Sequence, residues 1–462
     1  MAVQETIRAD GVAPGKAMPA WAAAGVYLLV AIISLGYGFQ YLFQGDAHEP
    51  YFHWVTLPFV AVMLSLSGFA LSAWPSSGKF APPGPVLGTM LMSISFLMTV
   101  FFYSSDLAPV PWPLVAGAVL AIAWYCHHRW GSRGSTLAFL ACAFVLYAVM
   151  IARVPHNVGA NMLEIIEAAS HSFLAGETPY RYYEPIAKQP FGYSPGLWLP
   201  YSVFVGLGLD VRILNLICFL LIVLVFEKGL RHQGDGAGAL SLTLYPFLLS
   251  PPVAQMIRHG HVWPYWIVLL LAMLMLLRQR YWVAAVFLGL ALASRPPALF
   301  VVGPLAAWLY WQVGWRRTLR YAAISLLAYG AVVMPFALWT GKNFWVYSYL
   351  ALGKLEVVLP QISVASWLEM VGLAGQLKFF QLSIVVFWTA AVFLRKKSGI
   401  DWFLFTAGIA YVWLVMFNAY VLRYVYFPGL FLMLMGLSIR LGHSDSAEMK
   451  VQQMRPAANT VM

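Results

Sequence analysis

Residues Tyr193–Asp210 read YSPGLWLPYSVFVGLGLD, and the predicted membrane topology of the whole chain depends on them. The segment is apolar, but it is short and contains Pro195, Pro200 and three glycines, which makes it a poor helix for crossing a membrane. If it did cross, every basic cluster after it would change sides. We therefore expect it to lie at the outer surface of the membrane, where aromatic side chains such as Trp198 are favoured.

The composition predicts a membrane protein with many spans. The chain has 462 residues, of which 61% are hydrophobic and 10% charged, and its mean hydropathy is +0.75. Apolar runs of roughly 16–23 residues recur from near Trp21 to near Arg440, and each is about long enough to cross a hydrocarbon core as a helix. A transmembrane barrel would need an alternating pattern instead of unbroken runs. We predict an all-α polytopic membrane protein with about 14 transmembrane helices, within a range of about 11–14.

The predicted spans separate basic clusters that all fall on one side. The spans lie near residues 21–43, 55–74, 86–104, 112–127, 136–152, 211–229, 237–252, 263–278, 282–294, 297–312, 318–339, 380–395, 401–419 and 424–441. The clusters are Arg129/Arg133, Lys228/Arg231, Arg278/Arg280, Arg316/Arg317/Arg320 and Arg395/Lys396/Lys397. Loops rich in Lys and Arg remain in the cytoplasm, so this side is predicted to be cytoplasmic. The other side then holds external regions at 153–210 and 341–379.

Several classes of protein are disfavoured. Cys126, Cys142 and Cys218 all lie in or beside apolar runs, so neither a disulfide framework nor a zinc site is expected. The net charge of +11 is explained better by the cytoplasmic loops than by a nucleic-acid partner, because no basic patch with interleaved aromatic residues lies outside the apolar runs. The phosphate-binding loops and the Ser-His-Asp context of soluble enzymes are missing from the sequence.

One external stretch, GANMLEIIEAASHSFLAGETPYRYY at 159–183, is unusually polar for this chain. A helix from Gly159 to Ala175 would place Asn161, Glu164, Glu167 and His171 on one face. This face could carry out chemistry. It could equally be the water-facing side of a helix that lies on the membrane.

A second polar group combines cations with apolar surroundings. The stretch PPVAQMIRHGHVW contains Arg258, His259 and His261, and Arg295 precedes two prolines between apolar runs. Cations beside apolar walls suit a phosphate attached to a lipid, since Arg offers planar paired donors. The alternative is that these side chains extend to the interface or are satisfied structurally. Two histidines and two glutamates could also bind a divalent cation, but they lack an HExxH or comparable spacing, so a site without a cofactor is the favoured expectation.

Together these motifs resemble the GT-C class of integral membrane glycosyltransferases. The resemblance covers about 136–311 and is strongest to the branch that uses polyprenol-phosphate-mannose and to its uncharacterised bacterial relatives. FLAGETPY matches that family's Leu-x-Gly-x-x-Pro-Tyr turn, YSPG matches a Tyr-Pro-Pro element in part, and HGHVW and Arg295-Pro296 stand where two further family motifs are usual. The first four predicted spans are an addition to the family's core.

The resemblance implies an inverting transfer of mannose, or of another hexose or pentose, from a polyprenyl-phosphate carrier to a lipid or glycan acceptor on the external face. Asn161 takes the place of the family's aspartate, and an amide cannot act as a general base. Glu164 is the favoured replacement and Glu167 the next. Two alternatives are a carboxylate from the extra loops (Asp46, Glu49 or Asp106) and a loss of catalysis. The implied substrate-binding residues are His171, Tyr180, Arg181, Tyr193, Arg258, His259, His261 and Arg295.

These expectations define the organisation of the chain. They divide it into a polar cytoplasmic tail (1–20), a four-helix membrane addition (21–135), a GT-C-like core with the external loop 153–210 (136–340), an external loop 341–379 with the C-terminal spans (341–441), and a polar cytoplasmic tail (442–462). Membrane lipids, the donor and the acceptor are the expected partners, and the bacterial cytoplasmic (inner) membrane is the expected location. Two other functions remain open, namely a transporter or flippase and an inactive assembly subunit with this fold.

Overall fold

The protein is described by a computed structural model that is almost entirely helical. It describes residues 25–26, 28–29, 32, 56–73, 112–153, 162–184, 186–230, 244–245, 247–249, 251–350, 363–396, 398–418 and 423–454. These residues contain a single sheet of two antiparallel strands, β1 (Tyr182–Tyr183) and β2 (Ala187–Pro190). The prediction of an all-α fold is confirmed.

Three of the described helices are long and apolar enough to cross a membrane, namely Val115–Arg153, Trp315–Thr340 and Ala374–Leu394. Five more are apolar but shorter, at Leu57–Leu71, Trp263–Leu277, Tyr281–Ser294, Ile400–Met416 and Tyr424–Arg440. The predicted spans 86–104 and most of 21–43 and 237–252 lie outside the described residues. The count of about 14 spans therefore remains a prediction.

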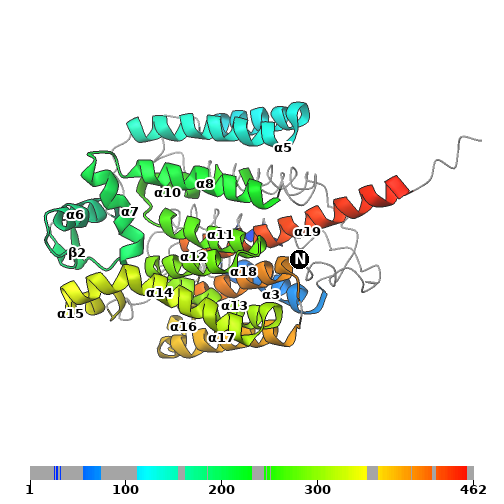
Figure 1. The fold of residues 1–462 in the computed structure, drawn as a ribbon. Helices are drawn as coiled ribbons and strands as arrows, with labels where there is room; N and C mark the ends of the chain where they lie inside the picture. Colours follow the sequence, from blue (N-terminus) through cyan, green and yellow to red (C-terminus); the bar gives the residue numbers. More distant parts are fainter. Residues whose placement is uncertain are drawn as a thin grey trace, which may run out of the picture.

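The apolar helices lie side by side in one bundle (Figure 1). They are α3 (Leu57–Gly68, followed by the π-helical η2, Phe69–Ala73), α5 (Trp112–Arg153), α8 (Arg212–Leu230), α11 (Trp263–Leu277), α12 (Tyr281–Ser294), α13 (Leu299–Val313), α14 (Trp315–Thr340), α17 (Leu377–Leu394), α18 (Ile400–Met416) and α19 (Phe427–Met454). Their bounds follow the predicted spans closely, because an unbroken apolar run is a local signal. α19 differs, since it continues into the predicted polar tail as far as Met454.

Glycines in the left-handed region separate helices that would otherwise be continuous. Gly131 (φ 70°, ψ −165°) interrupts α5 between the two predicted spans 112–127 and 136–152. Gly314 (φ 81°) ends α13 and begins α14. A side chain would be strained at both φ values, so glycine permits these reversals.

Short elements gather at one end of the bundle, which we call the α6/α7 end. They are α6 (Met162–Leu174), β1, β2, α7 (Pro195–Gly206) and α15 (Lys342–Trp345, followed by η5, Val346–Leu350), all on the left in Figure 1. α10 (Pro251–His259), η4 (Pro296–Ala298), α16 (Val364–Met370), η7 (Ala374–Gln376) and η8 (Arg423–Tyr426) complete the described elements. A separate hydrophobic cluster holds α6, α7 and α14 together there, with Leu163, Trp198 and Phe336 among its members.

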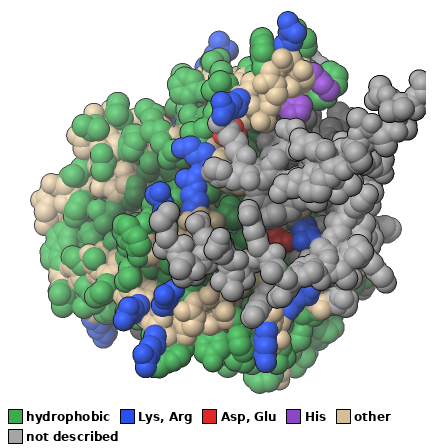
Figure 2. Space-filling model, turned by 45° about the vertical axis from the view of Figure 1, so that its right-hand side comes forward, with side chains coloured by type: hydrophobic (Ala, Val, Ile, Leu, Met, Phe, Trp, Pro, Cys, Tyr) green, Lys and Arg blue, Asp and Glu red, His purple; other side chains and the backbone are tan. Residues whose placement is uncertain are grey.

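The opposite end, which we call the basic end, carries the turns between α11 and α12, between α13 and α14, and between α17 and α18. Arg280, Arg316 and Lys396 are exposed there. Figure 2, in which this side comes forward, shows Lys and Arg side chains scattered among apolar ones. The grouping of the predicted basic clusters at one end is the pattern expected for loops that face the cytoplasm.

Candidate functional site

The stretch 193–210 forms α7, a helix that ends at Gly206 and is not a candidate span. It differs from the expected interfacial segment, because Trp198 and Tyr201 are fully buried by protein. The close approach of α7 to the end of α12 makes this burial possible. A Cβ atom on Gly196 would lie 2.8 Å from the Ala293 backbone carbon, so only glycine allows α7 to pack on the end of α12 at this point. α7 therefore holds the segment before it, which contains Tyr193, against the end of α12, and Arg295 is the next residue after that helix.

Two buried aromatic side chains fix the position of Tyr193. The Trp198 Nε1–H group donates a hydrogen bond to the Tyr180 hydroxyl (3.3 Å), which donates to the Tyr193 carbonyl oxygen (3.2 Å). Burial raises the pKa of Tyr180, so this hydroxyl stays protonated and remains a donor. Tyr180 was predicted to bind substrate; in the structure its side chain is fully buried and its hydroxyl is bonded to the Tyr193 backbone.

A buried amide, which the sequence analysis did not select, fixes the HGH segment. Asn215 Nδ2 in α8 donates to the carbonyl oxygens of Ile257 (3.0 Å) and Gly260 (2.8 Å), and its Oδ1 accepts from the Tyr201 hydroxyl. An amide inside an apolar helix requires such partners, because burying it without them is costly. The sequence signal that could have identified Asn215 is its position as a lone amide in the apolar run of α8. Asn215 thereby sets the backbone of the residue before His261.

The site that these contacts build is the His261–Arg295 centre, which consists of His261, Arg295, Tyr193 and Tyr424. The His261 ring centroid lies 4.4 Å from that of Tyr193 and 6.2 Å from that of Tyr424. The Arg295 guanidinium lies over the Tyr424 ring, with its carbon 5.7 Å from the centroid. Four chain segments that are distant in sequence thus meet at one point, and two members of the predicted cationic group, His261 and Arg295, lie there.

His261 has an unusual environment within this centre. Only 1% of it is exposed, and neither of its ring nitrogens, Nδ1 and Nε2, has a hydrogen-bond partner in the part of the chain that the structure describes. Burial lowers its pKa well below the ordinary value, and the charge of Arg295 lowers it further. The ring is therefore neutral at pH 7 and presents one N–H donor and one acceptor nitrogen. Each buried polar group without a partner costs about 1–3 kcal/mol, so this arrangement is unfavourable unless something binds to it.

Arg295 provides a half-buried charge beside this ring. Its contact with Tyr424 is electrostatic but supplies no acceptor for its N–H groups. Among the described ion pairs, none involves Arg295. A guanidinium that donates to none of the described side chains, next to a neutral imidazole, is suited to an anion with several oxygen atoms, such as a phosphate.

Helix α6 reaches this centre through its first residue. The Tyr424 hydroxyl lies 3.9 Å from the Met162 sulfur atom. At about 100° per residue, Glu164, Glu167 and His171 lie on the side of α6 opposite Met162, while Ile166 and Ala169 are buried on the Met162 side. His171 is exposed, and the two glutamates are half-buried. The structure thus brings the start of α6 to the centre but turns the predicted acidic face away from it.

The remaining predicted residues lie in three different settings. Arg181 is half-exposed and bound to Glu177 (2.9 Å) and to the Ser172 hydroxyl (2.8 Å), so it stabilises the turn after α6. Arg258 and His259 are buried at the end of α10, one turn before His261. Asn161 and the alternative bases Asp46, Glu49 and Asp106 lie outside the described residues.

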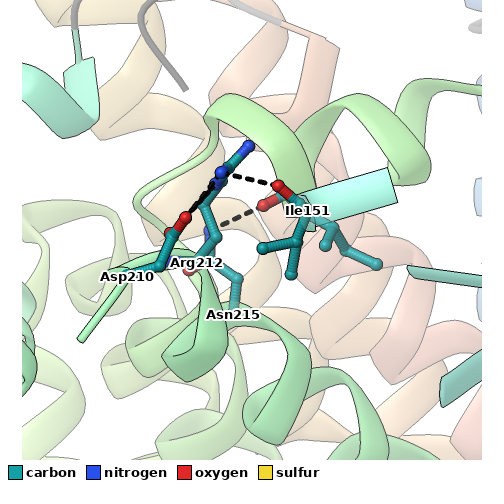
Figure 3. A network of polar contacts seen from close by, with 5 residues as sticks. Ile151, Asp210, Arg212 and Asn215 are labelled. Carbon is teal, nitrogen blue, oxygen red and sulfur yellow. Dashed lines mark hydrogen bonds and ion pairs between the residues drawn. The ribbon is translucent and has the colours of Figure 1, made fainter. Parts of the chain in front are cut away.

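A second charged group nearby has a structural role. Arg212 forms a two-pronged ion pair with Asp210 and donates to the Ile151 carbonyl oxygen (2.9 Å), as shown in Figure 3. Arg212 is 4% exposed, and its charge is balanced by a carboxylate. The pair connects the end of α5 to the beginning of α8. Arg212 thus differs from Arg295, which takes part in none of the described ion pairs.

The neutral imidazole and the guanidinium of the centre can both donate hydrogen bonds to an anion. Within the described part of the chain, no group of three or more His, Cys, Asp and Glu side chains could hold a metal ion. No family model matches the chain, and neither a curated protein nor a solved structure matches it.

Proposed function

We propose that the chain is an integral membrane glycosyltransferase with a GT-C-like arrangement of about 14 spans. It transfers a sugar from a polyprenyl-phosphate carrier to a lipid or glycan acceptor at the external side of the membrane, with inversion. The α6/α7 end is the external, catalytic end, and the basic end faces the cytoplasm. The proposal rests on the resemblance of the sequence motifs and on the chemistry of the His261–Arg295 centre.

The observation that carries the proposal is the buried His261 ring without hydrogen-bond partners beside Arg295. A sugar-phosphate donor would supply oxygen atoms to the imidazole N–H and to the guanidinium. These charge-assisted hydrogen bonds would offset the cost of burying the two side chains. Tyr193 and Tyr424 would provide apolar walls that exclude water and strengthen the bonds.

In the proposed reaction, a carboxylate removes the proton from an acceptor hydroxyl, whose oxygen attacks the anomeric carbon. The bond between that carbon and the phosphate oxygen breaks, and its electron pair stays on the phosphate. Arg295 and His261 stabilise the charge that develops there. The positive centre therefore acts on the leaving group, whose stabilisation is what a lipid-phosphate donor requires.

The base is assigned separately, since Glu164 and Glu167 lie on the side of α6 opposite Met162. Glu164 remains our first choice because it lies within one turn of Met162, which touches Tyr424. This assignment follows from the resemblance, and the phosphate-binding part of the proposal does not depend on it.

The test uses the purified full chain in lipid nanodiscs, with a short-chain prenyl-phosphate sugar as the probe. We expect Arg295→Gln to weaken binding by roughly 10- to 100-fold, the loss of one charge-assisted contact. Arg181→Gln is the matched control, since it removes an arginine at the same end that is already paired with Glu177. Equal binding by the Arg295 variant and the wild type would refute the phosphate site.

Sugar transfer to candidate acceptors is then measured with Glu164→Gln and Glu167→Gln. Loss of transfer with unchanged donor binding in the Glu164 variant would identify the base. If both variants transfer at the wild-type rate, the base lies elsewhere. Donor binding without transfer to any acceptor by the wild type would instead support a transporter or an inactive assembly subunit.

A further inference from the structure

A groove of about 770 Å³ lies between α13, α14 and α17, and none of the four residues of the His261–Arg295 centre lines it. Its floor is the face of α13 that carries Gly303, Ala306 and Ala307, which have almost no side chain to fill the space. The walls come from Leu319 of α14 and Val386 of α17, among others. The volume is within the range of about 300–1,000 Å³ that is usual for ligand sites.

The outer surface of this groove is apolar. Leu319 is 58% exposed, and Val386 is 57% exposed. α14 and α17 are two of the three helices long and apolar enough to cross a membrane. In a membrane, these side chains would face lipid tails, and the groove would open sideways to them. A hydrocarbon chain is the ligand that such a surface fits.

The groove has a charged edge at the basic end. Arg316 lies over the ring of Trp315, which lines the groove, at 5.6 Å. Lys396 lies over the ring of Trp311 at 5.2 Å. The Trp311 Nε1–H group donates to the carbonyl oxygen of Phe393, another lining residue (2.7 Å). Both cations thus stand beside the groove mouth on aromatic supports.

Neither cation is neutralised within the described structure. Arg316 and Lys396 are exposed, and none of the described ion pairs uses them. A negative head group above an apolar tail would complement this combination of a charged edge and an apolar channel. A neutral lipid or a second apolar helix would match the channel but not the edge.

We propose that this groove binds an acyl chain of an anionic phospholipid, with its phosphate held by Arg316 and Lys396. The site lies at the opposite end of the bundle from the proposed catalytic centre, so it is independent of the proposed function. An arginine over an indole ring is held in place, which lowers the cost of ordering it around the phosphate.

The helix geometry supplies a matched pair of variants. Trp315, Thr318 and Leu319 line the groove, so at about 100° per residue Arg316 lies next to that face. Arg317 lies on the opposite side of α14 and is also exposed. Arg316→Gln and Arg317→Gln therefore remove the same charge from the same helical turn, and only the first borders the groove.

The experiment measures retention of phosphatidylglycerol against phosphatidylcholine on the full-length protein by native mass spectrometry. We expect the wild type to prefer phosphatidylglycerol. Arg316→Gln should weaken phosphatidylglycerol binding about fivefold, the effect of one basic residue near an anionic surface, without changing phosphatidylcholine binding. Arg317→Gln should leave both unchanged. Equal loss in the two arginine variants, or no preference between the lipids, would overturn the proposal.

The channel is tested by filling it. Ala306→Phe, and the smaller Ala306→Leu, place new side chains in the groove from an exposed floor position. Both should reduce binding of the two lipids at unchanged unfolding midpoints. Unchanged phosphatidylglycerol binding in both variants would refute the groove as the site. A dimer of the wild type that Ala306→Phe dissociates would show that a second copy of the chain occupies the groove, which also refutes the proposal.

Discussion

Replacing His261 with Phe should make the protein more stable, although His261 belongs to the proposed site. The Phe ring keeps the tilted ring contact with Tyr193, whose centroid lies 4.4 Å away, and it removes two buried nitrogens that have no hydrogen-bond partner among the described residues. Each such group costs about 1–3 kcal/mol. Removing the two groups therefore stabilises the protein, but the slightly different shape of Phe causes packing strain, which costs about 1–3 kcal/mol for an added group in a core and offsets part of the stabilisation.

The expected net gain is therefore about 1–3 kcal/mol in the free energy of unfolding. It is measured as the unfolding midpoint of the detergent-solubilised protein at pH 8, followed by tryptophan fluorescence. His171→Phe is the matched control. His171 is exposed on α6, so that change should alter stability by no more than about 0.5 kcal/mol.

The same variant should lose binding of the prenyl-phosphate probe, because Phe offers no donor to a phosphate oxygen. A gain in stability combined with a loss of binding is typical of a residue kept for function. A His261→Phe protein that is less stable than the wild type would mean that the ring nitrogens are satisfied in the folded protein, and our reasoning about the centre would fail.

Three further predictions concern the same region and its support. Burial and the charge of Arg295 lower the pKa of His261 in the folded protein, so below about pH 6.5 the unfolded chain binds a proton that the folded chain does not. The stability of the wild type should therefore fall as the pH drops below about 6.5, and that of His261→Phe should fall less. Unfolding midpoints measured at several pH values check this. Asn215→Leu leaves the carbonyl oxygens of Ile257 and Gly260 and the Tyr201 hydroxyl without their partner, and should destabilise the protein by about 3–5 kcal/mol in denaturant titrations. A loss below about 1 kcal/mol, the net contribution of one hydrogen bond, would refute the view that Asn215 fixes this backbone. Gly289→Ala places a methyl group against the Ser325 backbone where α12 meets α14, and calorimetry should show a loss of about 1–3 kcal/mol unless the helices can separate freely.

The helices were predictable because they depend on local composition. The run that gives α8 ends within a residue of its prediction, and the runs for α11 and α13 are equally close, since an apolar stretch is helical wherever it lies in a bundle. The interruption of α5 at Gly131 follows the same logic, as a basic turn with glycines divides two apolar runs. The amphipathic helix α6 was also visible in the spacing of Leu163 and Ile166.

The candidate site was predictable only in part. The sequence marked a set of candidate cations but did not indicate which of them meet, because that depends on tertiary packing. His261 and Arg295 come together through α11 and α12, and Tyr424 joins them from a C-terminal segment with no polar motif. Tyr180 belongs to a motif of the external loop, yet its hydroxyl serves the backbone of Tyr193. A motif therefore located the region without distinguishing residues that bind from residues that position.

The difference between two arginines at the α6/α7 end gives the strongest physical reason to expect an anionic ligand. Arg212 is buried, and Asp210 balances its charge directly. Arg295 is half-buried, lies over an aromatic ring and borders a histidine whose pKa is lowered by burial and, in addition, by the charge of Arg295. Removing a cation from water is costly unless an opposite charge compensates for it, and the fold supplies such a charge to Arg212 but none to Arg295 among the described residues. The missing negative charge at the His261–Arg295 centre is therefore one that a ligand can bring.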